Sequence, residues 1–154
     1  MNVQNASIDT ISNRILDVCL LLPEVKTKLT TVRSLQVREL FAVYVVPDGA
    51  SRRLIAQRTM EITRNYRLWL ICTKAAGKSE AQEIEAVRAV YPYEHLLPKH
   101  FAQHSRLQLQ GDDGIVFKLR PMEDNGPKLT PIPGNSEQFG AWDYVLPVVT
   151  TEDF

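Results

Sequence analysis

Three histidines are the residues whose type and spacing come nearest to a reactive site. His100 and His104 stand four residues apart, a spacing that puts two imidazoles on one face of a helix and can hold a metal ion. A metal site also needs a third ligand, and Pro98 interrupts the helix that would align His95 with the other two. No carboxylate follows His100 in the pattern of a zinc hydrolase. We therefore expect no bound metal and interpret the histidines as surface or loop residues.

The other reactive residue types lack partners in the sequence. Asp112 and Asp113 lie between two glycines, where they suit a turn better than paired acid and base catalysis, and no lysine or helix follows to make a phosphate loop. Cys19 and Cys72 are embedded in apolar runs, which predicts buried thiols in a reducing compartment rather than a disulfide or a nucleophile. We expect no catalytic residues, no cofactor and no enzyme activity.

Arginines are concentrated in one stretch that could follow a phosphate backbone: Arg52, Arg53, Arg58, Arg64 and Arg67. Glu61 interrupts the stretch, and no helix-turn-helix pattern accompanies it. Lys plus Arg equals Asp plus Glu at 18 each, so the overall charge indicates neither a nucleic-acid nor a membrane surface. A solvated strand face or a subunit contact is the favoured interpretation of these arginines.

The 154 residues are enough for one domain, and we expect residues 1–154 to form it. The N-terminus lacks the basic and apolar regions of a signal peptide, and no apolar run approaches the roughly 20 residues that a membrane span needs. These features predict a soluble protein that is not exported by the usual signal.

Alternating periodicities predict an α+β fold. Apolar residues at helical spacing after Ser7 predict a first helix that Pro23 ends, and Ser79 with Gln82 predicts the capped start of a second helix that ends before Pro92. Strands are expected over residues 35–46, over 54–73 with a bend near Arg64 and Asn65, and over 139–150. Trp69 is expected to lie buried between the sheet and the two helices.

Turn residues predict where the strands reverse. Pro47, Asp48 and Gly49 indicate a chain reversal after residue 46, and the Gly-Asp-Asp-Gly segment predicts a β-hairpin over residues 106–120. The stretch 122–138 is rich in proline and glycine and lacks periodicity, so we expect a long loop there.

Isolated apolar residues in and after this long loop suit docking on another protein better than building a core. These residues are Leu129, Ile132 and Phe139. Together with Arg52 and Arg53 they form the candidate assembly interface that the sequence predicts.

The order of elements resembles the tail terminator (tail completion) proteins of long-tailed bacteriophages over roughly residues 7–149. The resemblance rests on the helix before Pro23, the apolar strand before Pro47, the strand around Trp69, the helix before Pro92 and the final strand around Trp142. The β-hairpin is part of the same order. The resemblance implies a mixed, mostly antiparallel sheet with two main helices packed on one face, and the long loop over residues 122–138 is a departure from the family's pattern.

The resemblance also implies a structural role in the virion tail, after assembly in the host cytoplasm. The expected assembly is a homo-hexameric ring that caps the tail tube, contacts the tail tube protein and a head-completion or neck protein, and lets genomic DNA pass through its channel. Two alternatives remain open beside this role: another neck or head-tail connector protein, and a small-ligand-binding α+β domain that uses the region from His95 to His104. A nucleic-acid-binding accessory module is a third.

Overall fold

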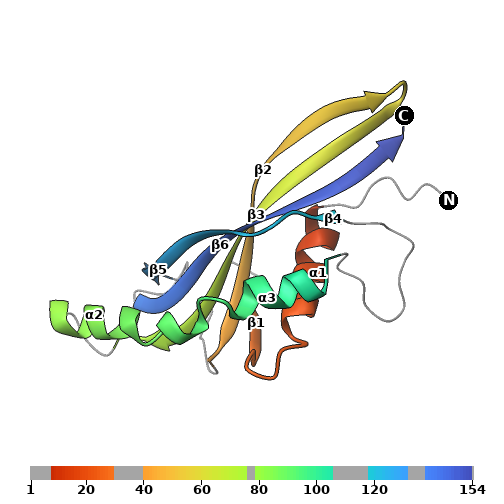
Figure 1. Cartoon of the computed structure of the whole chain (residues 1–154). Coiled ribbons are helices and arrows are strands. Elements are labelled where there is room, and N and C mark those ends of the chain that lie inside the picture. Colours follow the sequence, from red (N-terminus) through yellow and green to blue (C-terminus); the bar gives the residue numbers. More distant parts are fainter. Residues whose placement is uncertain (1–7, 30–39, 76–78, 106–117, 132–137, 154) are drawn as a thin grey trace.

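A mixed six-stranded sheet is the frame of the α+β fold, as expected (Figure 1). The computed structural model describes residues 8–29, 40–75, 79–105, 118–131 and 138–153. The strands are β1 (Thr27–Leu29), β2 (Ala42–Ala56), β3 (Thr59–Lys74), β4 (Lys118–Leu119), β5 (Glu123–Pro131) and β6 (Gln138–Asp153). Their order is β1-β2-β3-β6-β4, with β5 also paired to β6; β1 runs parallel to β2, and the other pairs are antiparallel.

The two predicted helices are present, although the first ends at Cys19, ahead of Pro23, and a third helix was not predicted. They are α1 (Ile8–Cys19), α2 (Glu80–Arg88), a 3-10 turn (Tyr91–Tyr93) and α3 (Leu96–Gln103). The hydroxyl of Ser79 accepts a hydrogen bond from the backbone N–H of Gln82, so the predicted cap of α2 is confirmed. The helix ends at Arg88, ahead of Pro92, also as predicted.

The larger core lies where α1 and α3 contribute side chains to one face of the sheet. Alternate residues of each strand point to this face, as the two-residue period of a strand requires. Its fully buried members include Ile11 and Ile15 of α1, Leu97 of α3, Tyr66 and Leu68 of β3, and Tyr144 and Leu146 of β6. Burial of this many large apolar side chains is the main source of stability.

A second, smaller cluster occupies the opposite face of the sheet. It contains Ala42, Tyr44, Ile71, Phe139 and Ala141, with Trp69 packed against it. Trp69 is therefore only half-buried and stacks on Tyr44, with ring centroids 5.6 Å apart. The expectation that Trp69 lies between the sheet and the helices is wrong, because strand alternation turns it to the other face. Trp142 takes the helix-facing position, and its indole N–H donates to the carbonyl of Val90.

The predicted reversal at Pro47, Asp48 and Gly49 is also wrong. β2 continues through this segment as a bulge, since the pairing with β3 shifts register between Pro47 and Ala50 and Gly49 takes a φ of 86°. The chain reverses instead at Gln57 and Arg58, where Arg58 itself has a φ of 70°. No glycine or proline marks that turn, so the sequence gives no warning of it.

The bend expected near Arg64 and Asn65 of β3 is absent there, and an irregularity is found in the paired strand β2 instead. β3 is continuous from Thr59 to Lys74, and Asn65 lies opposite the bulge in β2. An extra residue on one strand leaves the facing strand regular, so the irregularity predicted for β3 is found one strand away.

The long loop predicted over residues 122–138 is replaced in its first half by a strand. β5 pairs with β6 from Glu123 opposite Val145 to Pro131 opposite Gln138, with a bulge at Gly126. Proline is tolerated here because β5 lies at the edge of the sheet and needs no N–H on its outer side. The rest of the predicted loop, residues 132–137, lies outside the described residues. So does most of the hairpin predicted over residues 106–120, of which the structure describes residues 118–120 with the short strand β4.

Candidate functional site

An extended β arm exposes a long stretch of strand, with apolar and cationic side chains on it. We define the arm as residues 47–56 of β2, 59–65 of β3 and 147–153 of β6, which run beyond the helices in Figure 1. Every residue of β2 from 47 to 56 is exposed. In the described part of the chain, β1 pairs with β2 only at residues 42–44, so the outer edge of β2 has no strand beside it along the arm.

The end of the arm carries both apolar and cationic side chains. Leu54 and Ile55 are 64% and 46% exposed, and Arg52 and Arg53 precede them on the same strand. Arg53 forms an ion pair of 3.2 Å with Glu61 of β3. Glu61 also pairs with Arg120, at 3.6 Å. Leu54 and Ile55 were missed from the sequence because an apolar pair in a strand normally indicates a core position.

The predicted interface residues do not come together in one place. Arg52 and Arg53 lie on the arm, whereas Leu129 is half-buried on β5 opposite Gly140, near the other end of the sheet. Phe139 pairs with Lys74 at that end, whereas Thr151 of β6 pairs with Glu61 on the arm. Phe139 and Thr151 are twelve residues apart on β6, or about 40 Å at 3.3 Å per residue. Phe139 is 2% exposed, so its assignment to a docking surface is wrong. Ile132 lies outside the described residues.

His100 is a structural residue of the core. Its Nε2 lies 2.6 Å from the backbone carbonyl oxygen of Val18, and the side chain is buried, which contradicts the surface position expected for it. Burial, opposed by this hydrogen bond, lowers the pKa of His100 and favours the neutral ring. Nδ1 of His104 bonds the carbonyl of His100 at 3.0 Å, while His95 is exposed. In the described parts of the chain no three His, Cys, Asp or Glu side chains gather as metal ligands.

Pro98 was expected to break a helix, and this is wrong. It occupies the first turn of α3, where its missing N–H is not needed.

The two cysteines are buried and free, as predicted. Burial raises the pKa of the Cys72 thiol to about 12 and raises that of Cys19 as well, so both thiols stay protonated at neutral pH. A protonated buried thiol is a poor nucleophile.

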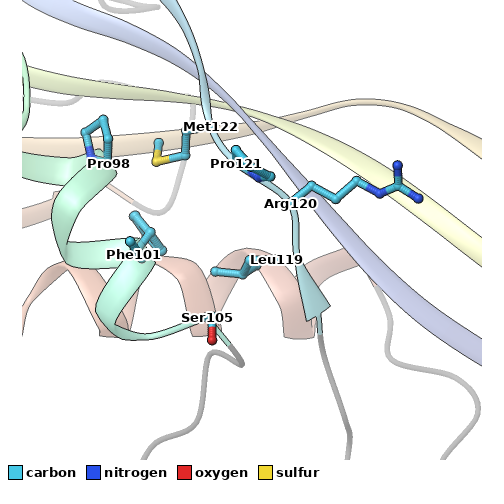
Figure 2. Close-up of a pocket in the computed structure, with 8 residues that line it drawn as sticks. Pro98, Phe101, Ser105, Leu119, Arg120, Pro121 and Met122 are labelled. Carbon is cyan, nitrogen blue, oxygen red and sulfur yellow. The ribbon is translucent and has the colours of Figure 1, made fainter.

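A shallow pocket of about 280 Å³ lies between α3 and the segment that joins β4 to β5 (Figure 2). Phe101, Leu119 and Met122 give it an apolar lining, and Arg120 points away from it. None of the three histidines is among the residues that line it. A catalytic pocket needs converging titratable groups, and the described walls of this one supply none.

A buried carboxylate lies on the second face of the sheet. The side chain of Asp143 is completely buried, and its Oδ2 lies 2.6 Å from Arg67 and 3.2 Å from Lys128. The guanidinium of Arg67 also lies 5.0 Å from the centroid of the Trp69 ring. This cluster ties the adjacent strands β3, β6 and β5 together through side chains. An aspartate in the middle of an apolar strand was the sequence signal for it.

The comparisons with known proteins give no family. No family model matches the chain, and a search of curated proteins finds no significant match. Within the described residues, no helix has the length and apolar character to cross a membrane.

Proposed function

We propose that this chain is a structural assembly protein that caps the end of a phage tail tube, stops its polymerisation and provides the surface to which the head joins. The observation that carries the proposal is the exposed arm, whose outer strand is exposed over residues 47–56 and has no strand beside it there within the described part of the chain. The described pocket and histidines supply no competing catalytic arrangement. The element order that resembles the tail terminators supports the same function.

The arm supports an assembly role because exposed strand edges and apolar side chains promote association. Folded monomers normally blunt a free edge with proline, a covering helix or a short strand. Here the free part of β2 is ten residues long, and Leu54 and Ile55 lie near its end. Pro47 and the bulge at Gly49 disturb the start of this edge, whereas residues 51–56 beyond them contain no proline and form the part of the edge open to a partner.

In this proposal six copies form a ring, with genomic DNA passing through its channel. One side of the ring contacts the tail tube protein, and the other contacts a head-completion or neck protein. The two main helices pack on one face of each subunit's sheet, which leaves the arm free for neighbours. Assembly takes place in the host cytoplasm, and the ring remains in the virion tail.

The phage whose genome encodes the chain provides the test. A stop codon early in the gene is expected to give overlong tail tubes without heads, because nothing ends tube growth. Supplying the wild-type chain in trans should restore normal length. Tails of normal length that lack heads would identify a neck connector instead, and normal infectious particles would contradict any role in the virion.

A further inference from the structure

The arm tip presents cations beside its exposed apolar residues. At the arm tip, Glu61 of β3 already pairs with Arg53 at 3.2 Å, so Arg52 and Arg58 carry the cationic character of this surface. Along residues 47–58 there are three arginines, Arg52, Arg53 and Arg58, against the single carboxylate of Asp48. All four are exposed, and Leu54 follows Arg52 at the two-residue spacing that places both on one face of the strand. This surface is suited to a partner that offers carboxylates around an apolar centre.

Helix α2 offers that combination. It carries Glu80, Glu83 and Glu85 against one arginine, and Ile84 is 46% exposed among them. Glu80 and Glu83 lie in the first turn, where carboxylates stabilise the helix dipole. Glu85 and Ile84 lie beyond that turn and are exposed, so no such local role explains them.

The two surfaces lie at opposite ends of one subunit. The arm tip is at the start of β3 and α2 is at its end, near Gly140, as Figure 1 shows. A strand of 16 residues spans about 50 Å at 3.3 Å per residue. The arm of one copy therefore cannot reach its own α2, and the complementary surfaces can meet only between copies.

Pairing of two arms edge to edge is the competing arrangement. Charge disfavours its register centred on residue 53, whereas a register centred on Leu54 would set Arg53 opposite Ile55. An antiparallel pair of free β2 edges centred on residue 53 would set Arg53 directly opposite Arg53 of the second copy. Like charges in directly opposite positions destabilise a strand pair. A contact between unlike surfaces avoids this repulsion.

We propose that the arm tip of one copy docks on α2 of the next copy, with Arg52 and Leu54 against Glu85 and Ile84. This inference rests on the proposed function and specifies the subunit contact of its ring. Contacts between unlike surfaces add subunits head to tail, and they close into a ring when the rotation between copies allows it.

Two variants of the full chain test the contact. Arg52→Glu with Leu54→Glu disables the arm, and Ile84→Lys with Glu85→Lys disables α2; all four positions are exposed. Lys99→Glu with Gln103→Glu and Glu94→Lys with Gln103→Lys make the same net changes of charge at exposed sites on and beside α3. Light scattering after size exclusion should show that each test variant associates at least about tenfold more weakly than wild type, the equivalent of 1.4 kcal/mol. The control variants should associate as wild type does.

Mixing the two disabled variants identifies the geometry. The arm-disabled copy keeps a working α2 and the α2-disabled copy keeps a working arm, so the mixture should give a one-to-one dimer that grows no further. Wild-type association should also weaken as salt increases, because the contact is partly electrostatic. If wild type assembles and both disabled variants do so equally well, or if their mixture gives no dimer, the contact is wrong while the proposed function stands. If wild type does not assemble at all, the proposed function itself fails.

Discussion

The imidazole of His100 on α3 donates from Nε2 to the backbone carbonyl of Val18 on α1, and this hydrogen bond of 2.6 Å fastens the two helices to each other. The N–H of Leu21 also donates to this carbonyl, at 3.2 Å. His100→Ala therefore removes one of its two hydrogen bonds together with a buried ring, which costs about 1–3 kcal/mol of unfolding free energy. Urea unfolding measures this loss. His95→Ala, at an exposed position, is the matched control and should change stability by less than about 0.5 kcal/mol. Equal effects of the two substitutions would contradict the structural role of His100.

The same histidine should make stability depend on pH. Because burial lowers the pKa of His100 in the folded state, the unfolded chain binds the proton more readily. Stability is then complete above the unfolded pKa of about 6.5 and declines as the pH falls from there towards the lower folded value. His100→Gln, which cannot titrate, should show a flatter profile between pH 7 and 5. An unchanged slope would assign the dependence to other groups.

The two tryptophans should differ in their contribution to stability. Trp142 is 5% exposed and its N–H donates to the carbonyl of Val90, which also accepts from the N–H of Tyr93. Trp142→Phe removes one of these two hydrogen bonds and part of a buried ring, and should cost about 1–3 kcal/mol. Trp69→Phe keeps an aromatic ring beside Tyr44 at a half-buried position and should cost less than about 1 kcal/mol. Acrylamide should quench Trp69 more than Trp142, as single-tryptophan variants would show. The reverse order would place the wrong tryptophan in the core.

Removing the two cations that pair with Asp143 should destabilise the protein more than removing the charge of Asp143 itself. Arg67→Ala with Lys128→Ala strands a completely buried carboxylate and should cost about 3–5 kcal/mol. Asp143→Asn frees two side chains that are partly exposed and can turn to water, so its cost should be smaller. Thermal unfolding of both variants at one pH measures the difference. A larger loss for Asp143→Asn would mean that the cations, not the carboxylate, are held away from solvent.

Local signals in the sequence were sufficient for α1 and α2, whereas α3 was missed because Pro98 was interpreted as a helix breaker. The apolar positions Ile11, Ile15, Val18 and Cys19 of α1 are all buried, since three- and four-residue spacing selects one helix face. The cap at Ser79 is equally local. These features involve residues within a few positions of one another, and no distant partner alters them.

The strands were predicted less well because pairing decides them. The bulge at Gly49 and the edge strand β5 exist because β3 and β6 supply long partners, and turn residues in isolation indicate reversal or loop. Strand pairing also affects the predicted interface. Phe139 is apolar and isolated in the sequence, yet its register on β6 buries it. Arg52 and Arg53 lie on an exposed strand, which agrees with one of the two interpretations of the arginine stretch, but the predicted strands stopped at residue 46 and began again at 54, so nothing local indicated an arm.

Electron microscopy of the purified full chain, with light scattering on the same sample, tests the central claim most directly. An assembly protein with an open arm at one end and a complementary helix at the other should give rings of uniform diameter with a central channel, at a mass of six chains. The arm-disabled variant should give single chains under the same conditions. A wild-type sample that contains only particles of one chain, at every concentration measured, would contradict the account.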